Sequence, residues 1–293
     1  MVNLSNTELE SIRSRLWTLG CMQSAGTRKV SAFEEKFREY QFPDGWDLPS
    51  NTWIKLLKGK RRPYGARLPR PNAPLVDRAE VIWPFSAEVF YTPSWFLLED
   101  REYTAQELLE SAQALPALYR DLFVSEFQRI ELPGLVLKEV HFELAFDLSS
   151  TVSLWSFGAL VVLMRRAELA GQIPVFRNAL AAILWMLPKI ADTVDAERRY
   201  LYQRLRRVII ATFLPKLALG QDGGQRSRLV NASYLQWFES HLKRYLYQRS
   251  LPFDHPDVRS TADGVFEAAR LRALRNYGPK VAAEDVHRPV SPV

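Results

Sequence analysis

The sequence has little material for metal, redox or disulfide chemistry. It contains one cysteine, Cys21, and four histidines among 293 residues. A single cysteine excludes an intramolecular disulfide framework and a cysteine-rich zinc module, and Cys21 lacks the sequence context of a nucleophile. Four histidines leave few ligands for a histidine-based metal site. We therefore expect no metal, no cofactor and a reducing compartment.

Long hydrophobic runs are also lacking. The longest mostly apolar stretch, residues 154–164, is well short of the roughly 20 residues that a membrane-spanning helix needs. The first residues are polar and do not show the charged-then-apolar pattern of a secretory signal. These features predict a soluble, cytoplasmic protein with no membrane partner.

The familiar signatures of catalysis are missing as well. The chain has no Gly-x-Ser-x-Gly, no His-Glu-x-x-His and no dinucleotide-binding fingerprint. The glycine-rich loop at residues 220–227 lacks the Lys and Ser or Thr that a phosphate-binding loop requires. We therefore expect a protein that is not an enzyme, with an enzyme acting on nucleic acid as an open alternative.

What the sequence does contain is typical of a folded helical protein. Hydrophobic residues make up 47% and charged residues 25%, which is ordinary globular usage. Thr104 and Glu107 have the spacing of a capping box. Apolar residues at helical spacing predict these long helices: 151–170, 174–187, 192–214, 229–249 and 262–276. We expect a first helix to end at Gly20, and the helix from Thr104 to continue beyond a break at Pro116 through Phe127.

One stretch between residues 50 and 76 concentrates positive charge. It has no acidic residue and contains seven basic ones: Lys55, Lys58, Lys60, Arg61, Arg62, Arg67 and Arg70. These seven charges exceed the net charge of +6 for the whole chain, so the remainder is close to neutral. Charge concentrated in this way indicates contact with phosphates, because each phosphate that a basic side chain neutralises releases condensed counterions.

The start of this basic stretch has the pattern of a short surface helix. Trp53, Ile54 and Leu57 are spaced to anchor one face. We expect the other face to carry, or to lie beside, Asn51, Thr52, Lys55 and Lys58. An asparagine can bond an adenine edge, and a lysine can reach guanine acceptors or phosphate. Gly59 then ends the helix, and residues 60–63 form a basic arm that can follow the sugar–phosphate backbone or lie in a minor groove.

The segment SNTWIKLLKGKRRP, residues 50–63, resembles the end of a Cro/repressor-type helix-turn-helix domain, where a short helix runs into a Gly-Lys-Arg-x-Pro-like exit. The resemblance extends over residues 31–63 and implies a small helical DNA-binding domain near the N-terminus. It also implies that Asn51, Thr52 and Lys55 face the DNA groove. Lys60, Arg61 and Arg62 would then face phosphates.

We accordingly predict a mainly α fold, with a small N-terminal helix-turn-helix-like module and a larger C-terminal helical domain. The expected segments are a basic helical module at 1–80, a strap rich in proline and aromatic residues at 81–103, a helical domain at 104–277 and a flexible tail at 278–293. Shorter helices are expected from Ser31, over 50–58 and over 75–82. The apolar residues within 135–148 fit the spacing of a strand and also that of a helix. We therefore expect this stretch to be either a helix or an extended connector.

The expected function is binding of double-stranded DNA and regulation of transcription, with RNA as an open alternative. The C-terminal helices are expected to serve homodimerisation or contact with a protein partner. The competing hypothesis is a non-catalytic helical interaction or scaffold protein. In that case the basic stretch keeps the chain soluble or docks an acidic partner, and glycine with basic residues at a helix end is ordinary C-capping.

Overall fold

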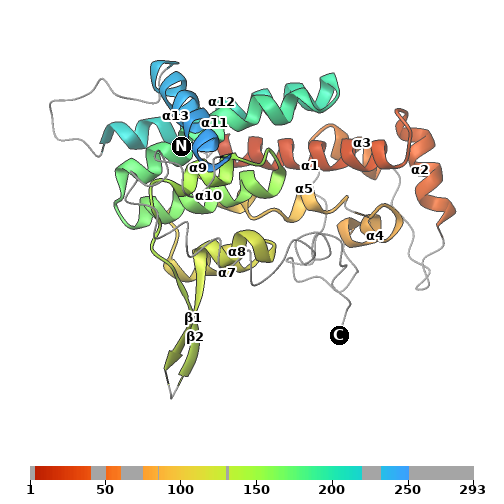
Figure 1. Ribbon diagram of the computed structural model, residues 1–293. Coiled ribbons are helices and arrows are strands. Elements are labelled where there is room, and N and C mark those ends of the chain that lie inside the picture. The colour runs from red at the N-terminus through yellow and green to blue at the C-terminus, as the bar shows by residue number, and fades with distance from the viewer. Residues whose placement is uncertain are drawn as a thin grey trace. The chain divides into compact units, whose positions relative to one another are not determined.

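The fold is seen in a computed structural model (Figure 1), which describes these residues: 4–40, 51–60, 75–84, 86–129, 132–219 and 232–250. They are mainly α-helical, as predicted, with one two-stranded hairpin. Residues 1–238 form one compact unit, and 239–293 form a second, of which 239–250 are described. The basic module, the strap and most of the C-terminal helical segment therefore belong to a single unit. The expected tail at 278–293 lies outside the described residues.

The N-terminal helices are α1 (Leu4–Ser24), α2 (Val30–Glu39), α3 (Thr52–Leu57), α4 (Leu75–Ile82), α5 (Glu88–Tyr91) and α6 (Ser94–Leu97). The helices expected from Ser31, near 50–58 and over 75–82 are confirmed. The expectation that α1 ends at Gly20 was wrong. The helix continues because Cys21 and Met22 are buried in its next turn, and Gly26, with φ of 65°, follows its end.

The C-terminal elements are α7 (Ala105–Gln113), α8 (Ala117–Phe123), β1 (Val124–Arg129), β2 (Leu132–Leu137), α9 (Leu144–Ser149), α10 (Leu154–Leu169), α11 (Ile173–Asp192), α12 (Ala196–Leu219) and α13 (Ala232–Ser250). The four long helices expected between residues 151 and 249 are confirmed. The one expected over 262–276 lies outside the described residues.

The hairpin corrects a second expectation. The helix expected to reach Phe127 ends at Phe123, and β1 pairs antiparallel with β2, with Val124 opposite Leu137. Val124 has extended backbone angles, and the Lys138 amide donates to the Phe123 carbonyl at 2.7 Å. Residues 135–148 accordingly divide into the end of β2, a connector and α9.

Helix α10 is the centre of the first unit. It packs against α11, α6, α7 and α9, and most of its residues are buried, so it is apolar almost all round. Its neighbour α11 is the one helix in the described ranges that is long and apolar enough to cross a membrane by length and composition. Of that stretch 67% is buried inside the protein, so packing against α10 and α12 accounts for its apolar composition.

A second, aromatic core joins the N-terminal helices. The Trp53 ring of α3 lies 4.6 Å from the Phe33 ring and 5.3 Å from the rings of Phe37 and Trp17. Trp83, from the end of the α4 segment, stacks on Phe33 at 4.7 Å. Such ring pairs add to the stabilisation that burial of large apolar side chains provides. Trp83, Ala87 and Phe90 of the strap at 81–103 therefore pack into this core.

Cys21 lies in the same core. Its side chain is fully buried, and burial, which outweighs a hydrogen bond with Ser86, raises the pKa of the thiol. The thiolate is the reactive form of cysteine. A buried thiol that stays protonated acts as a small apolar group, so Cys21 contributes to packing.

Candidate nucleic-acid interface

Helix α3 is a six-residue helix held in place by tertiary packing. Trp53 and Leu56 are fully buried, and α3 contacts both α1 and α2. Asn51 precedes the helix with a left-handed backbone (φ of 61°) and makes no side-chain cap. A helix this short is not stable alone in water. The aromatic core therefore decides where the side chains of α3 point.

The end of α3 is fixed by a Schellman motif. The Gly59 amide donates to the Leu56 carbonyl and the Lys60 amide donates to the Lys55 carbonyl, both at 2.8 Å. Gly59 has φ of 66°, and a Cβ added there would lie 2.0 Å from the Ser11 Oγ of α1. Only glycine meets both requirements. The close contact with α1 thus sets the direction in which the chain leaves α3.

This geometry yields a paired prediction. We expect Gly59→Ala to lower the free energy of unfolding by about 2–3 kcal/mol, because alanine would combine a strained backbone with overpacking against Ser11. Gly20→Ala is the matched control. Gly20 lies inside α1 with nothing within 4 Å of an added Cβ, so this change should stabilise the protein by about 0.5–1 kcal/mol. Urea unfolding followed by circular dichroism measures both, and a stable Gly59→Ala protein would contradict the packing argument.

Four of the expected contact residues are exposed on or beside α3: Asn51, Lys55, Lys58 and Lys60. We call these four residues the α3 surface. None of its three lysines forms an ion pair with any residue that the structure describes. Thr52, by contrast, is 1% exposed, so its side chain does not join this surface. Four further basic residues lie outside the described ranges: Arg61, Arg62, Arg67 and Arg70.

The arginines of α12 differ from these lysines because several of them are neutralised within the fold. Arg204 Nη2 lies 2.7 Å from Glu8 Oε1 and joins α12 to α1. Arg198 Nε lies 2.7 Å from Asp195 Oδ2 at the start of the same helix. These pairs make α12 a weaker candidate for contact with a polyanion than the α3 surface.

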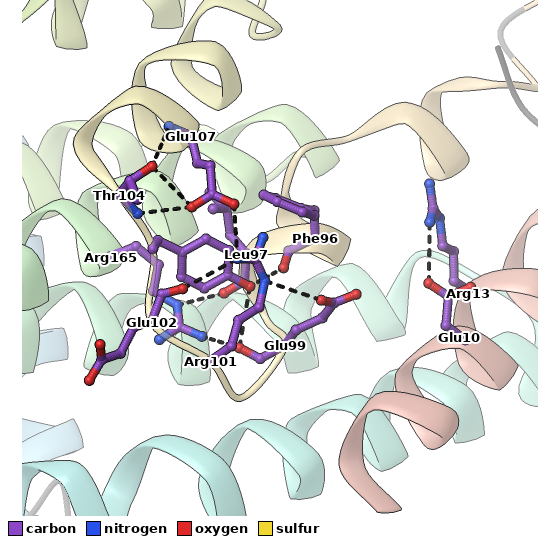
Figure 2. A network of polar contacts seen from close by, with 11 residues as sticks. Glu10, Arg13, Phe96, Leu97, Glu99, Arg101, Glu102, Thr104, Glu107 and Arg165 are labelled. Carbon is purple, nitrogen blue, oxygen red and sulfur yellow. Dashed lines mark hydrogen bonds and ion pairs between the residues drawn. The ribbon is translucent and has the colours of Figure 1, made fainter. Parts of the chain in front are cut away.

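A polar network surrounds Arg165 of α10 (Figure 2), whose side chain is 1% exposed. Its Nε donates to the Leu97 carbonyl at 2.6 Å, and its Nη1 lies 2.5 Å from Glu168 Oε2. Its Nη2 donates to the Glu99 carbonyl, and the guanidinium lies over the Tyr103 ring with 4.7 Å to the centroid. This arginine joins α10 to the turn that follows α6.

Neighbouring groups close the network. Arg101 Nη1 lies 2.9 Å from Glu107 Oε1, and Glu107 also completes the predicted capping box with Thr104 (Figure 2). Burial, opposed by the charges of Arg165 and Arg101, raises the pKa of Tyr103 to about 12, so its hydroxyl stays protonated and donates to the Phe96 carbonyl. Every side chain in the network has a partner, which points to a structural role. The sequence signal for it was an arginine inside the apolar pattern of α10.

No protein-family model, curated protein or solved structure matches this chain significantly.

The network predicts a pH dependence of stability. Burial of Glu168 opposes its ionisation, but the charge of Arg165 and hydrogen bonds from Lys216 and Arg165 hold its pKa below the usual value. A lowered folded-state pKa contributes stability that is present above the unfolded value of about 4.3 and is lost as the pH falls through the folded value. We expect Glu168→Gln to be less stable at neutral pH and to show a flatter acid limb. Unfolding free energies measured from neutral to acidic pH test this, and parallel curves for the two proteins would refute it.

Proposed function

We propose that this protein binds double-stranded DNA through the α3 surface and the basic segment that follows it, and that it regulates transcription. The observation that carries the proposal is the exposure of three lysines without ion-pair partners among the described residues, on or just after a helix fixed by a buried tryptophan. The sequence from 50 to 76 supplies no acidic residue to neutralise them. A cationic surface of this kind attracts a polyanion over long range.

Anchoring of α3 makes this surface suitable for recognition. The buried Trp53 and the Schellman motif at Gly59 hold the helix, so its exposed side chains require little reorganisation on binding. Lysine at these positions can contact phosphates, and Asn51 at the start of the helix can reach a base edge. Contact between α2 and α3 is in keeping with the paired helices of a helix-turn-helix. A homodimer would present two such surfaces to half-sites about 34 Å apart.

The test is a binding titration with matched charge variants. The triple variant Lys55→Ala, Lys58→Ala and Lys60→Ala should bind all duplex sequences more weakly. The loss should be the same for every sequence, because phosphate contacts carry no base information. The slope of log affinity against log salt concentration should become shallower by about 3, because three contacts that release counterions from phosphates are removed. The control triple removes the same net charge from three exposed positions elsewhere: Arg207→Ala, Lys243→Ala and Arg244→Ala. Fluorescence anisotropy with duplex DNA, single-stranded DNA and RNA at two ionic strengths measures each protein.

The outcomes separate the alternatives. Loss of duplex binding in the α3 triple but not in the control supports the proposal, whereas equal loss in both indicates attraction by net charge alone and overturns it. If the protein binds RNA more tightly than duplex DNA, RNA is its partner and the proposal of double-stranded DNA is wrong. Asn51→Ala should reduce the difference in affinity between preferred and random duplexes while leaving the salt slope unchanged.

A further inference from the structure

A cavity of about 200 Å³, partly open to solvent, lies within the first unit, between α1, the start of α10 and the junction of α11 with α12. Leu16, Leu154 and Ile190 give it apolar walls, and Ser153, Arg198 and Tyr202 add polar groups. A dry cavity of about 150 Å³ in another protein holds a benzene molecule. This cavity therefore has room for a hydrocarbon body of about the size of one ring.

Tyr202 supplies this cavity with a hydroxyl that is not used within the fold. The residue is 5% exposed, and its hydroxyl has no hydrogen-bond partner in the part of the chain that the structure describes. The hydroxyl is therefore free to donate to a molecule in the cavity. Burial, opposed by the charge of Arg198, raises the pKa of Tyr202 to about 12, so the phenol is a hydrogen-bond donor at neutral pH.

The groups beside Tyr202 define the charge of a ligand. Arg198 uses Nε for Asp195, and its two Nη groups have no partner within the described ranges. The N-terminus of the 16-residue helix α10 opens at Ser153, where the first amides of a helix carry partial positive charge. Asp195, 2.7 Å from Arg198 Nε, offsets part of the guanidinium charge, but it lies outside the lining and its side chain is 52% exposed. Arg198 therefore contributes mainly the N–H donors of its two Nη groups. A phenol donor, a guanidinium and a helix N-terminus together favour a carboxylate.

We propose that this cavity binds a small monocarboxylic acid with an apolar body of about one ring. The carboxylate accepts hydrogen bonds from the Tyr202 hydroxyl and the Arg198 guanidinium at the N-terminus of α10. The body lies against Leu16, Leu154 and Ile190. The site does not depend on DNA binding, so failure of either proposal leaves the other standing.

Benzoate is the probe, because it is ionised at neutral pH and has a single ring. Titration calorimetry on the full chain should detect benzoate binding, and the melting temperature should rise with benzoate concentration because the ligand binds the folded state. Benzyl alcohol, of similar shape but neutral, and acetate, which has the charge without the ring, should each bind at least tenfold more weakly. Equal affinity for benzyl alcohol, equal protection by acetate, or no benzoate binding would each overturn the proposal.

Two tyrosine variants locate the ligand. Tyr202→Phe removes only the hydroxyl and should weaken benzoate binding by about 10-fold to 100-fold, the range for a hydrogen bond to a charged group. The free variant should be about as stable as the wild type, because the hydroxyl that it loses makes no hydrogen bond in the described part of the chain. Tyr200→Phe, at an exposed position two residues away, is the control and should bind as the wild type does. Unchanged benzoate affinity in Tyr202→Phe would place the ligand elsewhere and refute the assignment.

Discussion

Arg165→Met is expected to lower the free energy of unfolding by about 3–5 kcal/mol, the usual cost of removing one partner from a buried charged network. Methionine fills a similar volume, so the loss reports the polar contacts and leaves the packing largely intact. The substitution leaves the carbonyls of Leu97 and Glu99 without their donor and takes a 2.5 Å partner from Glu168. Lys216, 2.9 Å from Glu168, compensates only in part because it does not bond the two carbonyls. Denaturant unfolding measures the effect.

Two further arginine variants sharpen this result. Arg165→Lys keeps the charge but lacks the planar fork that bonds three acceptors at once, so it should recover less than half of the lost stability. Arg207→Met, at an exposed position of α12, should change stability by no more than about 0.5 kcal/mol. Wild-type stability of Arg165→Met would mean that apolar packing replaces the network, and the structural role assigned to Arg165 would be wrong.

The parts of the fold that the sequence predicts correctly are those set by local interactions. The capping box of Thr104 and Glu107 lies within four residues, and α4 has the predicted bounds of 75–82. The hairpin was missed because strand pairing joins residues that local spacing does not relate. Val124 and Leu137 are 13 positions apart and become partners only in the folded chain.

In the candidate sites, too, some features follow from the local sequence and others only from tertiary packing. The concentration of positive charge at the α3 surface is a property of the sequence alone. The burial of Thr52 is not, because the orientation of a six-residue helix is decided by the aromatic core against which it packs. Tyr202 and Leu16 are far apart in the sequence, and no local motif predicts that they line one cavity.

Trp53→Ala is expected to cost about 3–5 kcal/mol of stability, the usual penalty for truncating a fully buried tryptophan. The removed ring is the one that contacts Trp17, Phe33 and Phe37 at once. Since α3 is too short to persist without this anchor, the α3 surface should lose its fixed geometry as well. We therefore expect weaker DNA binding by the folded variant, in addition to the lower stability measured by urea unfolding.

Trp83→Ala separates the loss of stability from the loss of DNA binding. Trp83 belongs to the same core and stacks on Phe33, but it is not part of α3, so its truncation should cost a similar free energy and leave DNA affinity nearly unchanged. Trp53→Phe is the conservative variant. It keeps an aromatic anchor and removes an indole N–H that has no hydrogen-bond partner among the described residues, so it should retain most of the stability and the DNA affinity. Equal loss of DNA binding in the two alanine variants would trace the defect to general destabilisation, and the link between Trp53 and the α3 surface would be wrong.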